Sequence, residues 1–528
     1  MSTHPVLIEG QWTSSAGTKS FQALNPATRE ALPGMYPVSP WDEVERAVRA
    51  ASAAFWRVRG WSGDRFAAFL DRYATNIEAR AAELVAMAHA ETALPVEPRL
   101  AKAELPRTTN QLRQAATAAR DGSWLRPIID SAANIRSVFA PIGPVVVFGP
   151  NNFPFAFNGI SGGDFAAAVA AGCPVIAKGH SSHPGTTRLF AEAAHEAARD
   201  TDMPPSFVQL IYRTSHEDGE KLVSHPLIGA CGYTGARATG LVLKAAADRA
   251  GKPIYLELSS INPVFVLPGA IAERGEKIAE ELTGSCLMGT GQFCTSPGLI
   301  VLLAGSQTDA FIESLQKRFD AAPVGTLLGE GVLKHLENGI ATLRQAGAEV
   351  IAGAAEVASG SRVCHPNTLL RVSGDRFLAH TEALQTEAFG NSSLIVVADN
   401  ADQMSQIAES LEGNLTGCLY SDIAGQDNAL YEQIEPALRQ RVGRLLNDKM
   451  PTGVAVSAAM NHGGPFPATG HPGFTAVGMP TSIQRFAMLQ CYDNVSRQDR
   501  LPPALRDKNP SGKLGRLVNG AWTHADVE

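Results

Sequence analysis

The chain has 528 residues, more than one hydrophobic core usually organises, so two or more domains are expected. Apolar residues make up 45% of the chain and charged residues 18%, which excludes a disordered protein and is ordinary for a globular one. A formal net charge of -7, without any long basic run, argues against a nucleic-acid partner.

The cysteines and the N-terminal residues indicate a reduced, cytoplasmic protein. The seven cysteines are scattered, and no CxxC or HExxH pattern predicts a zinc site, so no metal is expected. The first residues lack the basic and apolar segments of a signal peptide. The longest apolar run, near residues 165–177, is too short to cross a bilayer, so no membrane partner is expected.

The first third of the chain changes pattern twice. Residues 6–34 alternate apolar and polar side chains between turn signals, which predicts short strands and hairpins. Residues 41–119 follow an alanine-rich amphipathic pattern and predict helices. Strands are predicted at 136–140 and 145–148, separated by a Pro-Ile-Gly-Pro turn.

Strand and helix patterns then alternate over two long stretches. The first predicts strands at residues 145–148, 174–178, 206–212, 228–233 and 253–258, with helices between them. Such alternation implies a parallel sheet covered by helices on both faces. A second α/β domain is expected from 271 to about 468, and residues 513–522 predict a closing strand or hairpin.

Cys294 follows Gly289 and Gly291 on a loop that ends at Pro297. Glycines let backbone N–H groups approach a sulfur closely, which suits a nucleophile that must meet a substrate. Most cysteines, however, are simply buried in a core, and this composition alone leaves that alternative open.

Three other segments place polar groups where strands end. Asn152 follows a strand and could donate to an oxyanion, although asparagine is also a common turn residue. Glu257 ends an apolar strand, where a carboxylate is either a general base or a partner of an arginine or a helix N-terminus. Glu387 and Phe389 precede a strand and would be unremarkable alone.

In this order and spacing, the four motifs resemble the aldehyde dehydrogenase superfamily over residues 7 to about 494. The resemblance implies an α/β fold with a Rossmann-like cofactor domain, an α/β catalytic domain and a small β oligomerisation element. The corresponding predicted ranges are 1–124 with 140–260, then 261–465, and finally 125–139 with 490–528. Homodimers or homotetramers are expected.

The resemblance implies that Cys294 is the nucleophile and Glu257 the general base, while Asn152 and the Cys294 N–H form an oxyanion hole. An aldehyde would be oxidised to a carboxylic acid through a thiohemiacetal and a thioester. Phe153 and Phe293 would line the substrate pocket.

The same resemblance implies a nicotinamide cofactor. Lys178 would bind the adenosine ribose, Glu387 the nicotinamide ribose with Phe389 beside it, and Gly235 and Gly240 the pyrophosphate turn. That turn is not a GxGxxG motif.

The sequence departs from the usual family pattern after Glu257 and after Lys178. Ser259 and Ser260 replace two glycines after the base. Ser181 replaces a glutamate that receives the ribose 2′-hydroxyl in NAD-preferring members, and losing that carboxylate relieves repulsion of a 2′-phosphate. With Arg213 or His180 as a nearby cation, we expect NADP to be used well, with NAD as the alternative.

The cysteine loop and the motif that begins at His462 resemble an NADP-linked branch that includes α-ketoglutaric semialdehyde (2,5-dioxovalerate) dehydrogenases. A substrate carboxylate would need a cation at the pocket mouth, for which Arg485 is a candidate. A salt bridge at the surface or at an interface is an equal alternative for this arginine.

Four other functions remain to be weighed. NADP-dependent oxidation of fatty or other aliphatic aldehydes is one alternative, and a CoA-acylating semialdehyde dehydrogenase is another, although such members lack the base that Glu257 supplies. A cysteine hydrolase would need a histidine base, and no histidine motif accompanies Cys294. An inactive relative is disfavoured because nucleophile, base and oxyanion donor are all present.

Overall fold

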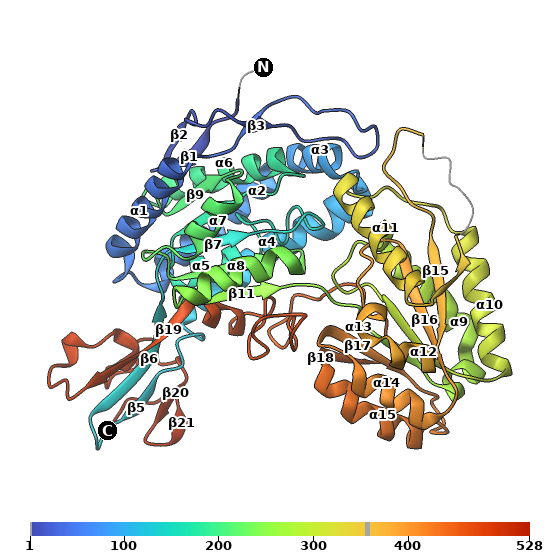
Figure 1. Ribbon diagram of the computed structural model, residues 1–528. Coiled ribbons are helices and arrows are strands. Elements are labelled where there is room, and N and C mark those ends of the chain that lie inside the picture. Colours follow the sequence, from blue (N-terminus) through green and yellow to red (C-terminus); the bar gives the residue numbers. More distant parts are fainter. Residues whose placement is uncertain (1–2, 354–359) are drawn as a thin grey trace.

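The computed structural model describes residues 3–353 and 360–528. Two α/β lobes lie side by side, and an arm of strands projects from the first lobe (Figure 1). The second lobe is formed by the middle of the chain, and the C-terminal part returns to the first lobe and the arm. The predicted α/β fold class is confirmed.

The first lobe is built on a seven-stranded sheet in the order β11-β10-β7-β8-β9-β1-β2. β7 to β11 are parallel, whereas the N-terminal hairpin of β1 and β2 joins the edge at β9 in antiparallel fashion. The strands are β1 (Val6–Ile8), β2 (Gln11–Thr13), β7 (Val145–Phe148), β8 (Val175–Lys178), β9 (Val208–Ile211), β10 (Ala230–Thr234) and β11 (Ile254–Glu257). The short pair β3 (Ser20–Phe21) and β4 (Tyr36–Pro37) lies outside this sheet.

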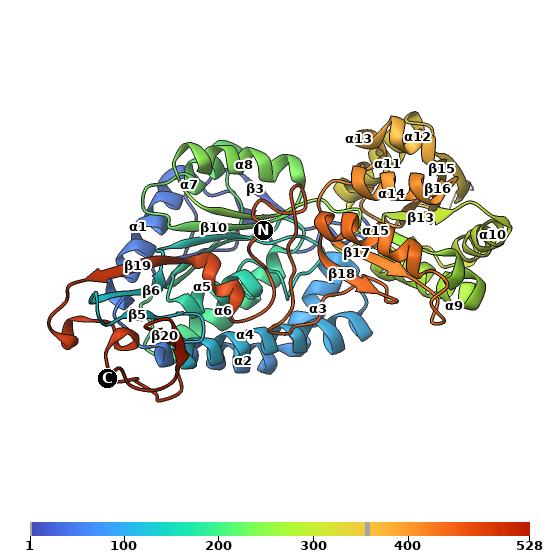
Figure 2. The ribbon, with the colours of Figure 1, turned by 90° about the horizontal axis from the view of Figure 1, so that it is seen from below.

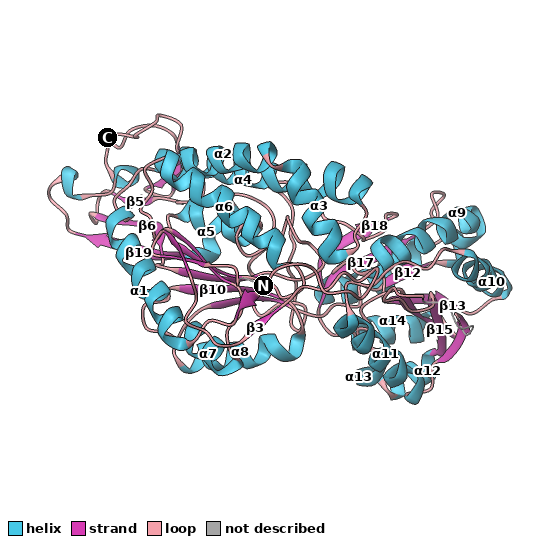
Figure 3. Ribbon diagram, turned by 90° about the horizontal axis from the view of Figure 1, so that it is seen from above, coloured by secondary structure: helices cyan, strands magenta, loops and turns pink. Residues whose placement is uncertain are grey.

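Helices cover both faces of this sheet (Figure 3). One face carries α1 (Trp41–Val58), α7 (His216–Val223) and α8 (Arg237–Arg249). The other carries α2 (Gly63–Ala79), α4 (Leu105–Asp121), α5 (Gly163–Ala171) and α6 (Pro184–Asp200). The strands β7 to β9 are almost wholly buried, which explains their continuous apolar sequences.

The predicted helical stretch 41–119 is interrupted after α3 (Ala81–Thr92). Ala93 adopts a left-handed conformation with φ 55° and ends α3, and Pro95 follows it. A π-helical segment, Val96–Glu104, then leads into α4. This irregular segment aims Arg99 and Glu104 at the loop after β7, where both make hydrogen bonds.

The second lobe contains another seven-stranded sheet, in the order β14-β15-β16-β13-β12-β17-β18. Only the edge strand β14 is antiparallel to its neighbour. Its strands are β12 (Val264–Val266), β13 (Leu299–Leu303), β14 (Glu349–Ala352), β15 (Thr368–Ser373), β16 (Ser392–Ala398), β17 (Asn414–Tyr420) and β18 (Val442–Asn447). Its helices are α9 (Pro268–Leu287), α10 (Ser306–Ala321), α11 (Glu330–Gln345), α12 (Gly374–Ala379), α13 (Thr381–Leu384), α14 (Ala401–Ser410) and α15 (Asn428–Arg441).

The arm is a five-stranded sheet in the order β19-β6-β5-β20-β21, reached from the first lobe through β6 and β19 (Figure 2). Its strands are β5 (Ile128–Asp130), β6 (Ile135–Pro141), β19 (Ala487–Asp493), β20 (Arg516–Val518) and β21 (Ala521–Thr523). Its core includes the fully buried Arg516, whose guanidinium donates to the carbonyls of Arg506, Asp507 and Ala525. The predicted residue ranges of the three domains stay a proposal.

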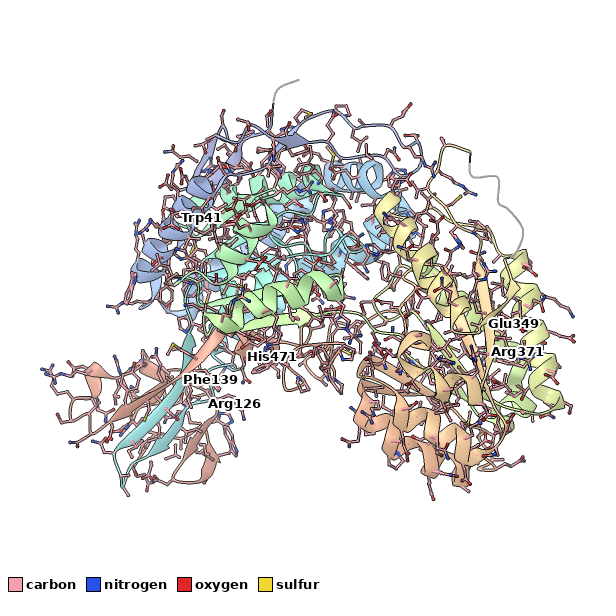
Figure 4. The ribbon with its side chains drawn as sticks, viewed as in Figure 1. Trp41, Arg126, Phe139, Glu349, Arg371 and His471 are labelled. Atoms are coloured by element: carbon pink, nitrogen blue, oxygen red, sulfur yellow. The ribbon has the colours of Figure 1, made fainter. Side chains whose placement is uncertain are left out.

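The chain after β18 returns beneath the first sheet. Leu258 N–H donates to Ala468 O at 2.8 Å, and His471 Nε2 donates to Ile254 O at 2.9 Å below β11 (Figure 4). This return brings His462 and Thr469 to Glu257 at the carboxyl end of β11.

The strand order of the first sheet indicates where a ligand binds. The connections from β7 run outward in both directions, to β8 and β9 on one side and to β10 and β11 on the other. Ligands of open α/β sheets bind at the carboxyl ends of the strands where the order reverses in this way. Within the described residues, no helix is both long and apolar enough to cross a membrane.

Candidate active site

Side chains from both lobes meet at the carboxyl ends of the first sheet. Asn152 lies four residues after β7, and Glu257 is the last residue of β11. Cys294 comes from the loop between α9 and β13 in the second lobe. The structure therefore brings together the three residues for which the sequence predicts catalytic roles.

The cysteine loop contains a close backbone approach that only glycine allows. After α9, a turn at Met288–Gly291 places Gly291 at φ 68°, where a Cβ atom would lie 2.0 Å from the carbonyl oxygen of Gly390. Asn262 Nδ2 donates to the carbonyls of Cys294 and Ser296 at 3.0 and 2.9 Å. The loop is thus held against both the Glu387 segment and the turn after Glu257.

Cys294 lies beside a histidine and a carboxylate. His462 Nε2 is 3.6 Å from Cys294 Sγ and 2.7 Å from Glu257 Oε1. Burial, and next the negative charge of Glu257, raise the pKa of the Cys294 thiol well above its usual value. The resting sulfur is therefore protonated, and its activation requires a nearby proton acceptor.

His462 corrects the expectation that no histidine accompanies Cys294. The two residues are 168 positions apart, and His462 is buried, with its backbone N–H donating to Thr475 Oγ1 at 2.8 Å. The sequence marked the segment that begins at His462 only as a branch motif. Its closeness to the thiol depends on the return of the chain beneath β11, for which the sequence contains no local signal.

Glu257 is buried, and only one of its two carboxylate oxygens has a hydrogen-bond partner among the described residues. Its Oε1 contacts His462, whereas Oε2 is buried without a hydrogen-bond partner among the described residues. The alternative partners considered from sequence, an arginine or a helix N-terminus, are replaced by this histidine. A carboxylate oxygen left free beside the sulfur is suited to accept a proton from water.

The Asn152 amide points toward the cysteine loop. Its Nδ2 donates to the carbonyl of Gln292, two residues before Cys294, at 3.0 Å. Arg99 Nη2 donates to the Asn152 carbonyl at 2.8 Å and fixes the backbone at this position. An amide nitrogen carries two N–H groups, so one remains for an oxyanion at the sulfur.

The expected adenosine site lies at the ends of β8 and β9. Lys178 ends β8, the exposed Ser181 follows three residues later, and the exposed Arg213 lies two residues after β9. Burial, and secondly the positive charge of Arg213, lower the pKa of Lys178 to about 8. Because the charge of Arg213 affects the pKa of Lys178, the two cationic side chains lie near each other.

The glycines expected near the pyrophosphate lie at the start of α8. Gly235 follows β10 directly, and a Cβ atom on Gly240 would lie 2.5 Å from Leu258 Cδ2. The helix therefore packs close to the turn after β11, and a helix N-terminus, which here begins at Arg237, can bind an anion through its free N–H groups. A cavity of about 850 Å³ is lined there by Arg237, Ser259, Ser260 and Glu387, among others, so these residues fit a dinucleotide.

Glu387 faces the serines that replace the usual glycines. The Ser260 N–H donates to Glu387 Oε1 at 3.4 Å. Burial raises the pKa of Glu387 to about 7, against the opposing effect of hydrogen bonds from Ser260 and Ser259. Phe389 lines a small cavity together with Glu387 and Phe293.

Arg485 does not lie at the mouth of the substrate pocket, where the sequence predicted it. The residue is 3% exposed, and its Nη1 lies 2.7 Å from Asp164 Oδ1, so its charge is already neutralised inside the protein. The salt-bridge alternative describes this arginine, although the bridge is buried. Phe153 and Phe293 do lie together, with ring centroids 5.3 Å apart.

Cys294, Glu257 and His462 also have the donor atoms of a metal site, all within 4.8 Å of one another. A resident ion there would bind the sulfur and the carboxylate at once. Both groups would then lose the lone pairs that nucleophilic attack and proton transfer require, so acid–base chemistry suits this cluster better.

Comparisons with known proteins agree on one family. A model described as the aldehyde dehydrogenase family matches residues 12–459. The chain is 40% identical over 522 residues to alpha-ketoglutaric semialdehyde dehydrogenase 2 of Azospirillum brasilense, covering 96% of each chain. It is 36% identical over 530 residues to alpha-ketoglutaric semialdehyde dehydrogenase of Acinetobacter baylyi, covering 98% of each.

Solved structures have the same fold. Lactaldehyde dehydrogenase from Escherichia coli superposes with a TM-score of 0.80 at 21% identity, covering 93% of this chain and 98% of that one. Aldehyde dehydrogenase C from Pseudomonas syringae, solved in complex with NAD+ and octanal, has a TM-score of 0.79 at 19% identity, covering 93% and 96%.

The pKa of Glu387 predicts a pH-dependent cofactor affinity. An acid with a raised pKa is protonated below pH 7 and ionised above it, and only the ionised carboxylate accepts hydrogen bonds from both ribose hydroxyls. We expect NADH to bind about three- to tenfold more tightly at pH 7.5 than at pH 6. Fluorescence titration measures this, and Glu387→Gln should abolish the dependence; an affinity that is equal at both pH values in the wild type contradicts the assignment.

Proposed function

Because the chain belongs to the aldehyde dehydrogenase family, we propose that it oxidises α-ketoglutaric semialdehyde (2,5-dioxopentanoate) to 2-oxoglutarate. Members of this family are NAD(P)-dependent oxidoreductases, and two relatives that carry this substrate in their names align over nearly the whole chain. The observation that carries the chemistry is the grouping of Cys294, Glu257 and His462 within 4.8 Å.

The first half of the reaction needs a thiolate. The proton leaves Cys294 for the unprotonated Nε2 of His462, 3.6 Å from the sulfur, and the imidazolium so formed donates to Glu257 Oε1, which offsets the cost of ionising a buried thiol. Attack on the aldehyde carbon gives a thiohemiacetal, whose oxyanion receives hydrogen bonds from Asn152 and the Cys294 N–H. The bound nicotinamide supplies the hydride acceptor.

The second half needs an activated water. Oxidation leaves a thioester on Cys294, and the free Oε2 of Glu257 takes a proton from water that attacks it. His462 holds Oε1 and so orients the carboxylate. A base in this position supports hydrolysis over transfer to CoA, the nearest alternative.

Two substitutions separate the two halves. Cys294→Ala should remove all reduction of the cofactor, because no thiohemiacetal forms. Glu257→Gln should retain a first burst of reduced cofactor, since His462 still accepts the thiol proton, while steady turnover falls about 1,000-fold or more. Stopped-flow absorbance of the reduced nicotinamide measures both.

Two results oppose this assignment. Residual steady oxidation in Cys294→Ala would mean that another group attacks the aldehyde. A panel containing α-ketoglutaric semialdehyde, succinic semialdehyde and a long alkanal tests the substrate; a higher kcat/KM with the alkanal favours the alternative of an aliphatic aldehyde dehydrogenase.

The preferred cofactor is proposed to be NADP. Ser181 presents no carboxylate to a 2′-phosphate, and Lys178 and Arg213 concentrate positive charge at the same edge of the sheet. Arg213 is exposed and therefore able to meet a ligand at the rim.

Removing the charge of Arg213 should weaken the binding of NADP but not that of NAD. For Arg213→Gln we expect the KM for NADP to rise about tenfold, because a phosphate loses a charge-assisted partner, whereas the KM for NAD changes less than about twofold. Initial rates with both cofactors measure this. Equal effects on the two cofactors, or a better kcat/KM with NAD in the wild type, would count against the preference.

The arm is proposed to bind a second copy of the chain. Its edge strands β19 and β21 expose large apolar side chains, with Leu489 60% and Trp522 65% accessible. Unpaired edges with apolar side chains are typical of surfaces that associate. A homodimer or homotetramer covers them.

A charge on the arm should break this association. Leu489→Asp places a carboxylate in the middle of β19 and should shift the protein toward monomers, as measured by light scattering. Ile423→Asp is the matched control, since Ile423 is 85% accessible but lies in the second lobe. A wild-type monomer, or equal dissociation in both variants, refutes the role of the arm.

A further inference from the structure

An apolar wall adjoins the candidate nucleophile. It consists of Phe153, Ala156, Phe157, Phe293, Val454 and Val477. Phe153 follows Asn152 directly and Phe293 precedes Cys294, so the wall begins beside the sulfur. The aliphatic part of an aldehyde bound to that sulfur has this wall as its neighbour.

Arg107 of α4 lies on this wall with part of its guanidinium unpaired. Its Cζ is 5.4 Å from the centre of the Phe157 ring and 5.9 Å from that of Phe153, and Nη1 donates to the carbonyl of Val454. Nε and Nη2 are buried and have no acceptor among the described residues. Burial lowers the pKa of Arg107, which reflects the cost of its desolvated charge.

Glu104 is the acidic residue that most favours the charged form of Arg107, but its carboxylate already has other partners. Glu104 Oε1 accepts the N–H groups of Phe155 and Ala156, and Oε2 lies 3.2 Å from Arg99 Nη1. Glu104 therefore pairs with Arg99.

Neighbouring arginines each leave one buried nitrogen without an acceptor among the described residues, namely Arg99 Nε, Arg444 Nε and Arg485 Nη2, whereas Arg107 leaves two. Arg99 donates to Asn152 and faces Glu104, Arg485 faces Asp164, and Arg444 Nη2 donates to the carbonyls of Pro451 and Gly453. Arg107 has a single carbonyl partner, and two adjacent N–H groups remain on one edge of its guanidinium. That edge has the geometry that binds a carboxylate through two parallel hydrogen bonds.

We propose that Nε and Nη2 of Arg107 bind the substrate carboxylate at the end of the chain opposite to the aldehyde. This assignment rests on the proposed function and replaces the predicted role of Arg485. Buried donors without a partner are costly, so a carboxylate-bearing aldehyde satisfies them, whereas a neutral alkanal leaves them unpaired. Arg107 is then a specificity residue that selects semialdehydes over alkanals.

The test compares two five-carbon aldehydes, α-ketoglutaric semialdehyde and pentanal, in the wild type and in Arg107→Met. We expect kcat/KM for the semialdehyde to fall about 100-fold, mainly through KM, because a charged bidentate contact is lost. The value for pentanal should change less than about threefold and reports that the variant is folded. Arg113→Met, on the same helix but paired with the exposed Glu78, is the matched control and should leave both values unchanged.

The outcomes distinguish this inference from the proposed function. A wild-type protein that oxidises pentanal as efficiently as the semialdehyde contradicts the proposed substrate. A wild-type preference that survives in Arg107→Met contradicts the role of Arg107. An equal loss with both aldehydes also contradicts it, since it would assign Arg107 to the thiolate or to folding.

A second variant keeps the inference testable if Arg107→Met fails to fold. Arg107→Lys retains the charge but not the paired N–H edge. Inhibition of pentanal oxidation by the product 2-oxoglutarate should weaken about tenfold in this variant, because one point charge replaces a bidentate contact. An unchanged inhibition constant overturns the proposal.

Discussion

The contact between Glu257 and His462 is the interaction on which the candidate site depends. A carboxylate buried at the end of β11 is costly without a partner, and the 2.7 Å contact with His462 supplies one. The same contact ties the C-terminal return of the chain to the first sheet and brings the imidazole within 3.6 Å of Cys294. Because only Oε1 is engaged, the second oxygen of Glu257 stays available, so one hydrogen bond serves both stability and chemistry.

Gly291 and two asparagines hold the cysteine loop in place. Gly291 allows the cysteine loop to approach Gly390, which brings the loop close to the Glu387 segment. Asn262 Nδ2 donates to the Cys294 carbonyl, and Asn414 Oδ1 accepts the N–H groups of Ile261 and Asn262. A sulfur that must meet both an aldehyde and a nicotinamide needs such a loop, because a larger side chain at position 291 would separate it from the segment expected to hold the ribose.

Arginines near the site divide according to their partners. Arg485 and Arg99 face carboxylates within the protein, so their charges stabilise its interior. Arg213 at the rim is exposed to solvent, and Nε and Nη2 of Arg107 on the apolar wall are buried without an acceptor among the described residues. Since an unpaired charge is tolerated where a ligand completes it, the two arginines match the two anionic groups of the proposed reaction, the 2′-phosphate and the substrate carboxylate.

Local patterns in the sequence determined the elements and the main chemistry. Period-2 and period-3.6 repeats with their turn residues located the strands and helices of the first lobe, apart from the break after α3, and motifs singled out Cys294, Glu257 and Asn152. Only the tertiary structure decided the partners. His462 is 168 residues from Cys294, and whether Arg485 or Arg107 keeps a free charge depends on Asp164 and Glu104. Sequence patterns report on neighbours within a few residues, whereas burial and hydrogen bonding depend on segments that meet only when the chain is folded.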